Sequence, residues 1–128
     1  MSKPESVMAE ELECIICRVP RKNHDAMLQV CREANETFRK HGIRSDVFQL
    51  NNTDVPMEGI TNIAHVVITN HDEEVWVNTR YYKDRRHMKD VRAKLSNDKS
   101  MMSLYKQSRE LMPAGPSFIV GDFDRLNT

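Results

Sequence analysis

The sequence predicts an α+β fold in which helices cover an antiparallel β-sheet, and three observations lead to this prediction. Short apolar runs that end at turn residues alternate along the chain with longer segments of helical periodicity. Two of the apolar runs are separated by a short polar segment, which is typical of an antiparallel hairpin. The length of 128 residues suffices for one modest core. We therefore expect a flexible leader over residues 1–10 and a single domain over residues 11–128.

The first half of the chain predicts a strand, a helix and a second strand. Leu12–Val19 is too short for a helix, is partly β-branched and ends at a proline, so we expect a strand with apolar side chains on both faces. Asn23 is the candidate cap of a helix that runs to His41 and is closed by Gly42. A second strand is expected over Ile43–Leu50, followed by a turn-rich loop.

The second half completes the expected topology. It predicts strands over Thr61–Thr69 and Glu74–Tyr82, a helix capped by Asp84 that runs to about Leu95, a helix capped by Ser100 or Asp98 that runs to Met112, and a last strand over Ser117–Phe123. The order β-α-β-β-α-α-β is the split βαβ pattern of a ferredoxin-like sandwich with one additional helix.

The charge balance and the cysteine content narrow the class of protein. Lys and Arg number 19 and Asp and Glu number 19, so a constitutive nucleic-acid binder is not expected. The basic segment Lys83–Lys94 is better explained as a solvated helix face. No apolar run approaches the roughly 20 residues of a membrane span. Three cysteines and a polar N-terminus without a signal-peptide pattern predict a cytoplasmic protein with reduced thiols.

The predicted fourth strand indicates which sheet face stays open. Val75, Val77, Thr79 and Tyr81 form its more apolar face, which we expect to meet the helices. The opposite face mixes apolar and polar side chains, as a pocket wall does, and carries these candidate ligand-binding residues: Trp76, Asn78, Arg80, Tyr82 and, from the third strand, His65. We therefore predict that two such sheets face each other in a twofold homodimer, a dimeric α/β barrel that encloses a cavity. The alternative is a monomer in which a loop covers Trp76.

Several short segments together resemble one family. The segments are VPRKNHDA (Val19–Ala26), FRKHG (Phe38–Gly42), DVPMEG (Asp54–Gly59), KLSND (Lys94–Asp98) and GDF (Gly121–Phe123). In this order they are similar to the YbaA-like family of uncharacterised prokaryotic proteins, over roughly residues 12 to 126. The resemblance implies a dimeric α+β barrel, the superfamily of cofactor-independent and haem-degrading monooxygenases. It transfers no catalytic residue, and Tyr81 stands where the family pattern often has an acidic residue.

The cysteines and histidines do not predict a metal or redox centre. Cys14 and Cys17 form a CxxC, but residues three apart on a strand point to opposite faces, so core packing is favoured for both and for Cys31. The histidines show no HxxxH or HxH spacing. For His65, a hydrogen-bonded structural role is favoured over that of a catalytic base.

The candidate cavity allows more than one function, and no cofactor is expected. Trp76, Asn78 and His87 resemble loosely the haem-degrading set, whose asparagine lies on the first strand, where this chain has none. Arg80 could hold a small anionic or phenolic ligand, or it could simply pair with Glu74 or another carboxylate. We expect a protein that binds a small organic ligand. The alternatives are a cofactor-independent monooxygenase or isomerase of an aromatic or enolisable substrate, and a dimer whose contacts fill the space.

Overall fold

The computed structural model of the protein describes residues 10–51, 57–67, 69–115 and 117–128, so the expected leader lies almost wholly outside the described residues. Four strands form one sheet in the order β2-β3-β1-β4, and every neighbouring pair is antiparallel. The strands are β1 (Glu11–Pro20), β2 (Arg44–Gln49), β3 (Glu73–Tyr82) and β4 (Phe118–Asp124). The two long strands β1 and β3 therefore occupy the centre of the sheet.

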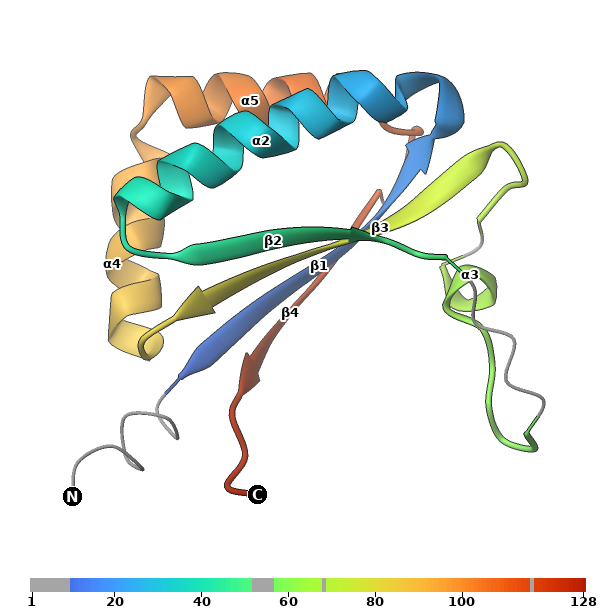
Figure 1. Cartoon of the computed structure of the whole chain (residues 1–128). Coiled ribbons are helices and arrows are strands. Elements are labelled where there is room, and N and C mark those ends of the chain that lie inside the picture. The colour runs from blue at the N-terminus through green and yellow to red at the C-terminus, as the bar shows by residue number, and fades with distance from the viewer. Residues whose placement is uncertain (1–9, 52–56, 68, 116) are drawn as a thin grey trace.

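The helices gather on one face of this sheet. The helices α2 (His24–Lys40) and α5 (Lys99–Glu110) run side by side above it, and α4 (Arg85–Ser96) lies across one end (Figure 1). A 3-10 turn, η1 (Arg21–Asn23), precedes α2, and the short α3 (Ile63–Val66) lies beside the end of β2, away from α2 and α5 (Figure 1). This arrangement confirms the predicted α+β fold with an antiparallel sheet, and it is compatible with a ferredoxin-like topology.

Local capping explains where most helices begin and end. The Asp84 carboxylate accepts a hydrogen bond from the His87 amide at 2.7 Å, and the Asp98 carboxylate accepts one from the Met101 amide at 3.0 Å. Gly42, with φ of 74°, follows α2 in the left-handed conformation that favours glycine. Asn23 departs from its expected role, because its side chain does not cap α2 and instead donates to the Leu111 carbonyl at 2.8 Å.

The prediction of a strand over Thr61–Thr69 is wrong. Residues 63–66 form the helical turn α3, which Asn62 caps by accepting a hydrogen bond from the Ala64 amide at 2.8 Å. A hairpin between this segment and β3 is also excluded, because both edges of β3 are already hydrogen-bonded, one to β1 and the other to β2. The hairpin partner of β3 is thus β2, and the long segment between them is a connection.

The predicted orientation of β3 is also wrong. Trp76, Asn78, Arg80 and Tyr82 do share one face, but this face meets the helices, and Val77 lies on the open face. The register places these four side chains beside Cys17, Ile15, Glu13 and Glu11 of β1, which alternate as buried residues with half-buried ones. Carboxylates on this side accept hydrogen bonds from Trp76, Arg80 and Tyr82, so the more polar face of the strand is the interior one.

The core consists of two clusters under the helical layer. The cluster near the start of α2 contains Cys17, Val19, Met27, Trp76 and Met112. The cluster near its end contains Phe38, Ile43, Tyr82, Met88 and Val91. No helix of the described ranges is long and apolar enough to span a membrane.

We expect Met88→Ala to lower the free energy of unfolding by about 2–5 kcal/mol, because it leaves a cavity in the second cluster. Chemical denaturation followed by circular dichroism measures this loss. Met102→Ala is the matched control, since Met102 is 58% exposed on α5, and it should change the free energy by less than about 0.5 kcal/mol. Equal losses in the two variants would contradict the assignment of Met88 to the core.

Candidate functional site

A cavity of about 290 Å³ lies between the sheet and the two long helices. It exists because α5 packs chiefly against α2 rather than on the strands beneath it. Apolar side chains from all sides form most of its wall, among them Ile15 and Val120 from the sheet and Val30 and Leu104 from the helices. Two side chains of β3, Asn78 and Arg80, bring polar atoms to this wall. An apolar hollow with a few convergent polar groups is the usual form of a small-molecule site.

Arg80 combines one satisfied and one unsatisfied donor. Its Nη1 donates to Glu13 Oε1 at 2.9 Å, and its guanidinium lies over the Phe38 ring, 4.1 Å from the centroid. Its Nε is buried and has no hydrogen-bond partner among the described residues. A buried donor without an acceptor costs about 1–3 kcal/mol, so the surrounding structure must offset this cost at Arg80.

Glu13 of β1 holds Arg80 in place, and both of its carboxylate oxygens accept hydrogen bonds. Besides Arg80, its Oε1 accepts from the Tyr82 hydroxyl at 3.3 Å, and its Oε2 accepts from Arg92 Nη2 at 2.7 Å. Arg92 also donates to Asp122 of β4 at 2.7 Å. The carboxylate therefore connects β1, β3 and α4, and through Arg92 it reaches the edge strand β4.

Burial and the neighbouring Glu13 carboxylate raise the pKa of Tyr82 to about 12. The phenol therefore keeps its proton at neutral pH and acts as a donor to Glu13. Tyr82, Arg80 and Arg92 also line a second hollow of about 350 Å³ on the other side of Arg80, toward α4. The two hollows share four lining residues, Phe38, Arg80, Met101 and Tyr105, so these side chains border both of them.

The cysteines show no sign of redox or metal chemistry. The register places Cys17 on the helix-facing side of β1 and Cys14 on the open side, which confirms that the CxxC sulfurs point apart. Burial raises the pKa of Cys17 to about 12 and also raises the pKa of Cys31, so both thiols in the cavity wall stay protonated. Within the described ranges, no group of three or more His, Cys, Asp or Glu side chains could hold a metal ion.

Trp76 belongs to a separate polar cluster and does not line the cavity. Its Nε1 donates to Glu74 Oε1 at 2.9 Å, and His24 Nδ1 lies 2.7 Å from the same oxygen. The His24 and Trp76 rings meet edge to face at 5.2 Å. Burial opposes ionisation of Glu74, but the hydrogen bonds from His24 and Trp76 prevail and lower its pKa. This geometry fits a structural role for Trp76.

The structure brings together three of the five predicted ligand-binding residues. Asn78 and Arg80 line the cavity, and Tyr82 lines the adjoining hollow with Arg80. His65 does not join them, because it lies in α3 rather than on a strand of the sheet. The residues that loosely resemble the haem-degrading set do not form one site either. Trp76 packs in the first core cluster, whereas the His87 ring lies against the Tyr82 ring, with 5.9 Å between the ring centroids.

Sequence reasoning missed Glu13, Phe38 and Arg92. Arg92 lies in the basic segment Lys83–Lys94, which the sequence predicts as a solvated helix face, and no pattern in the sequence links Phe38 to Arg80. The signal for Glu13 lies in β1, where Glu11 and Glu13 precede Ile15 at alternate positions and so share its inward face. An acidic residue on the interior face of a central strand indicates a buried cationic partner.

We expect Glu13→Gln to lower the free energy of unfolding by about 3 kcal/mol, because it leaves the partly buried Arg80 without its counter-charge. Urea denaturation at pH 7 measures the loss. The control is Asp46→Asn, whose pair with Arg44 is exposed and should contribute less than about 1 kcal/mol. If the two variants lose the same free energy, Glu13 does not organise the site.

Comparisons with known proteins place the chain in a family without assigning an activity. The search of curated proteins found no match. Among solved structures, a chain titled "De novo designed protein Foldit4" aligns with a TM-score of 0.48 and 9% sequence identity, over 93% of this chain and 99% of that chain. The family model described as "Protein of unknown function (DUF1428)" matches residues 11–113, and the chain therefore belongs to this family.

Proposed function

We propose that the protein binds a small organic ligand in the cavity between the sheet and helices α2 and α5, with an acceptor group of the ligand at Arg80. The observation that carries this proposal is the guanidinium of Arg80, which lines an otherwise largely apolar wall and whose hydrogen bond to Glu13 uses Nη1 alone. A carboxylate or a carbonyl oxygen could accept a hydrogen bond from this cation.

The rest of the wall determines what the ligand carries besides its acceptor. Ile15, Val30, Leu104 and Val120 would surround a hydrocarbon chain or a ring, and burial of that apolar surface stabilises the complex by about 25 cal/mol per Å². Asn78 adds a side chain that both donates and accepts hydrogen bonds. The ligand class is thus an amphipathic organic acid or carbonyl compound of modest size.

The protonation states in the cavity support binding rather than catalysis. Oxygenation or isomerisation without a cofactor requires a base that deprotonates the substrate. The Cys17 and Cys31 thiols of the cavity wall have raised pKa values, and the pKa of Tyr82 in the adjoining hollow is raised to about 12, so all three keep their protons at neutral pH. Glu13 is ionisable, but three donors already occupy its oxygens.

We also propose that the protein forms a homodimer through the sheet face that the helices leave open. Phe48, Ile119 and Phe123 lie on this face and are 55%, 46% and 54% exposed. Val77 and Ile16 lie between them on the central strands, so the apolar surface extends across the whole sheet. Two copies of such a face can bury each other in a twofold arrangement with sheet against sheet, as in a dimeric barrel. The ligand cavity then lies on the far side of each sheet from the partner.

Ligand binding is tested by isothermal titration with decanoate and trans-cinnamate as probes. We expect Arg80→Met to weaken binding of the better probe about 10- to 100-fold, since a charge-assisted hydrogen bond contributes about 1.5–3 kcal/mol. Arg44→Met is the control, because Arg44 is exposed and lies outside the cavity.

Ala34→Met gives a second, uncharged test of the same cavity. Ala34 lines the cavity on α2, so the longer side chain should block the probe, whereas Ala93→Met on the exposed face of α4 should leave binding unchanged. Circular dichroism verifies that each variant is folded. Binding that survives both Arg80→Met and Ala34→Met would overturn the proposal.

The dimer is tested by size-exclusion chromatography with light scattering. We expect the wild type to have twice the mass of the chain, and Ile119→Asp to yield a folded monomer because it buries a charge in the interface. Met102→Asp places the same charge at an exposed apolar position on α5 and should leave the dimer intact. A monomeric wild type at micromolar concentration would refute the proposed dimer.

A further inference from the structure

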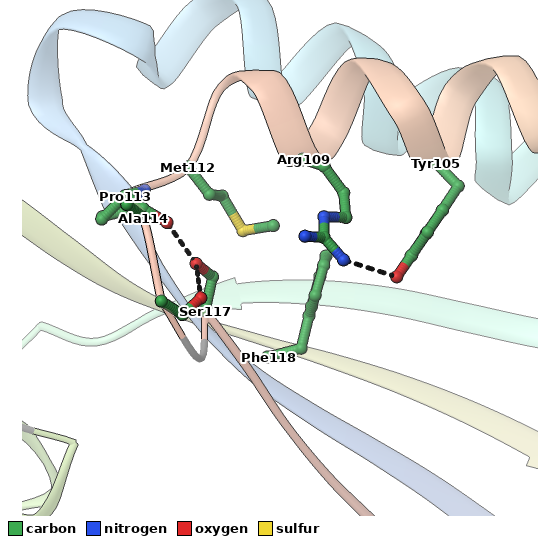
Figure 2. A pocket seen from close by; sticks show the side chains of 8 residues that line it. Tyr105, Arg109, Met112, Pro113, Ala114, Ser117 and Phe118 are labelled. Carbon is green, nitrogen blue, oxygen red and sulfur yellow. Dashed lines mark hydrogen bonds between the residues drawn. The ribbon is translucent and has the colours of Figure 1, made fainter.

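A third hollow, of about 490 Å³, lies at the end of α5 where the chain turns toward β4. Tyr105, Arg109, Met112 and Phe118 form its main walls, with Ser117 on the turn (Figure 2). We refer to it as the outer crevice. The outer crevice lies outside the proposed ligand site. It contains one cationic side chain, which forms no ion pair among the described residues.

That cation is Arg109. Its guanidinium lies between the α5 helix and the Phe118 ring, within the outer crevice (Figure 2). It donates to the Tyr105 hydroxyl at 3.4 Å and lies 6.0 Å from the centroid of that ring. Within the described ranges Arg109 forms no ion pair with a carboxylate, in contrast to Arg80, Arg85 and Arg92. Its strong donors are therefore available to an anion in the crevice.

The outer crevice and the Arg80 cavity share a wall. The Tyr105 and Phe118 rings line both hollows, and they stack nearly parallel, with an interplanar angle of 18° and centroids 6.0 Å apart. Tyr105 also lines the hollow on the far side of Arg80 and is 56% exposed. The three hollows therefore lie one after another along α5. The aromatic side chains of Tyr105 and Phe118 border both the Arg80 cavity and the outer crevice.

The spacing along α5 relates the two cations. Met101 lines both hollows that adjoin Arg80, and Arg109 follows it by eight residues (109 − 101), which is about 12 Å along the axis of an α-helix. Apolar and aromatic groups occupy the interval, among them Leu104 and Tyr105 from the helix and Phe118 from the strand.

We infer that the outer crevice is the second half of one extended site, and that the ligand carries an acidic group at each end of an apolar middle. One acidic group meets Arg80 in the cavity, and the other meets Arg109 in the crevice. The apolar middle passes the Tyr105–Phe118 pair, along the part of α5 between Met101 and Arg109. This inference rests on the proposed function, since it assigns the second end of the same ligand.

Isothermal titration with decanoate and decanedioate tests the inference, because these probes differ only in the second carboxylate. We expect the wild type to bind decanedioate about three- to fivefold more tightly than decanoate, because a partly exposed ion pair adds only a modest amount of affinity. Arg109→Met should abolish this preference, so that the variant binds the two probes with equal affinity. Arg86→Met, an exposed arginine on α4 outside all three hollows, is the matched control and should preserve the preference. Hexanedioate, which is too short to reach both cations, should show no advantage over hexanoate.

The outcomes separate this inference from the proposed function. If decanoate binds in an Arg80-dependent manner but decanedioate gains nothing, or keeps its gain in Arg109→Met, then the extended site is refuted and the cavity stands. If neither probe binds, both the extended site and an alkyl acid ligand are refuted. Arg109 is on the protein surface, so its replacement by methionine should not impair folding, and a thermal melt of each variant verifies this.

Discussion

The carboxylate of Glu13 is the contact on which both the packing and the site depend. It lies on a central strand, receives donors from Arg80 and Tyr82 of β3, and is joined to α4 through Arg92. Removal of these charges from water is costly, and the cluster is tolerated because each carboxylate oxygen is hydrogen-bonded. The same arrangement determines the conformation of Arg80. Glu13 holds Nη1 of the guanidinium, and the buried Nε has no acceptor among the described residues.

The two faces of the sheet have different chemistry for one physical reason. Polar atoms are stable in the interior where partners satisfy them, and the helix-facing side supplies such partners for Trp76, Arg80 and Tyr82. The open face has apolar side chains such as Phe48 and Phe123, which need no partner atoms but gain free energy when covered. The proposed ligand and the proposed partner chain therefore occupy opposite faces. Variants on one face can be studied without direct interference from the other.

The position of α5 determines the extent of the candidate site. Because this helix packs chiefly on α2, the space between it and the strands is not filled, and hollows follow its length. Tyr105 contributes to all three of them, and the two cations, Arg80 from β3 and Arg109 from α5, line different hollows. A long amphipathic molecule fits this shape better than a compact one, since its apolar part can follow the helix while its ends meet the guanidinium groups.

The sequence by itself determined the elements whose signals are local. Alternating apolar runs located β1, β2, β3 and β4 to within a residue or two, and Asp84 and Asp98 marked two helix starts. Period-two alternation likewise showed that Trp76, Asn78, Arg80 and Tyr82 share a face. It could not show which face, because the deciding partner of Arg80 is Glu13, 67 positions away. Only the tertiary structure, through the pairing of β3 with β1 and β2, turned this face toward the helices and left Thr61–Thr69 without a strand to join.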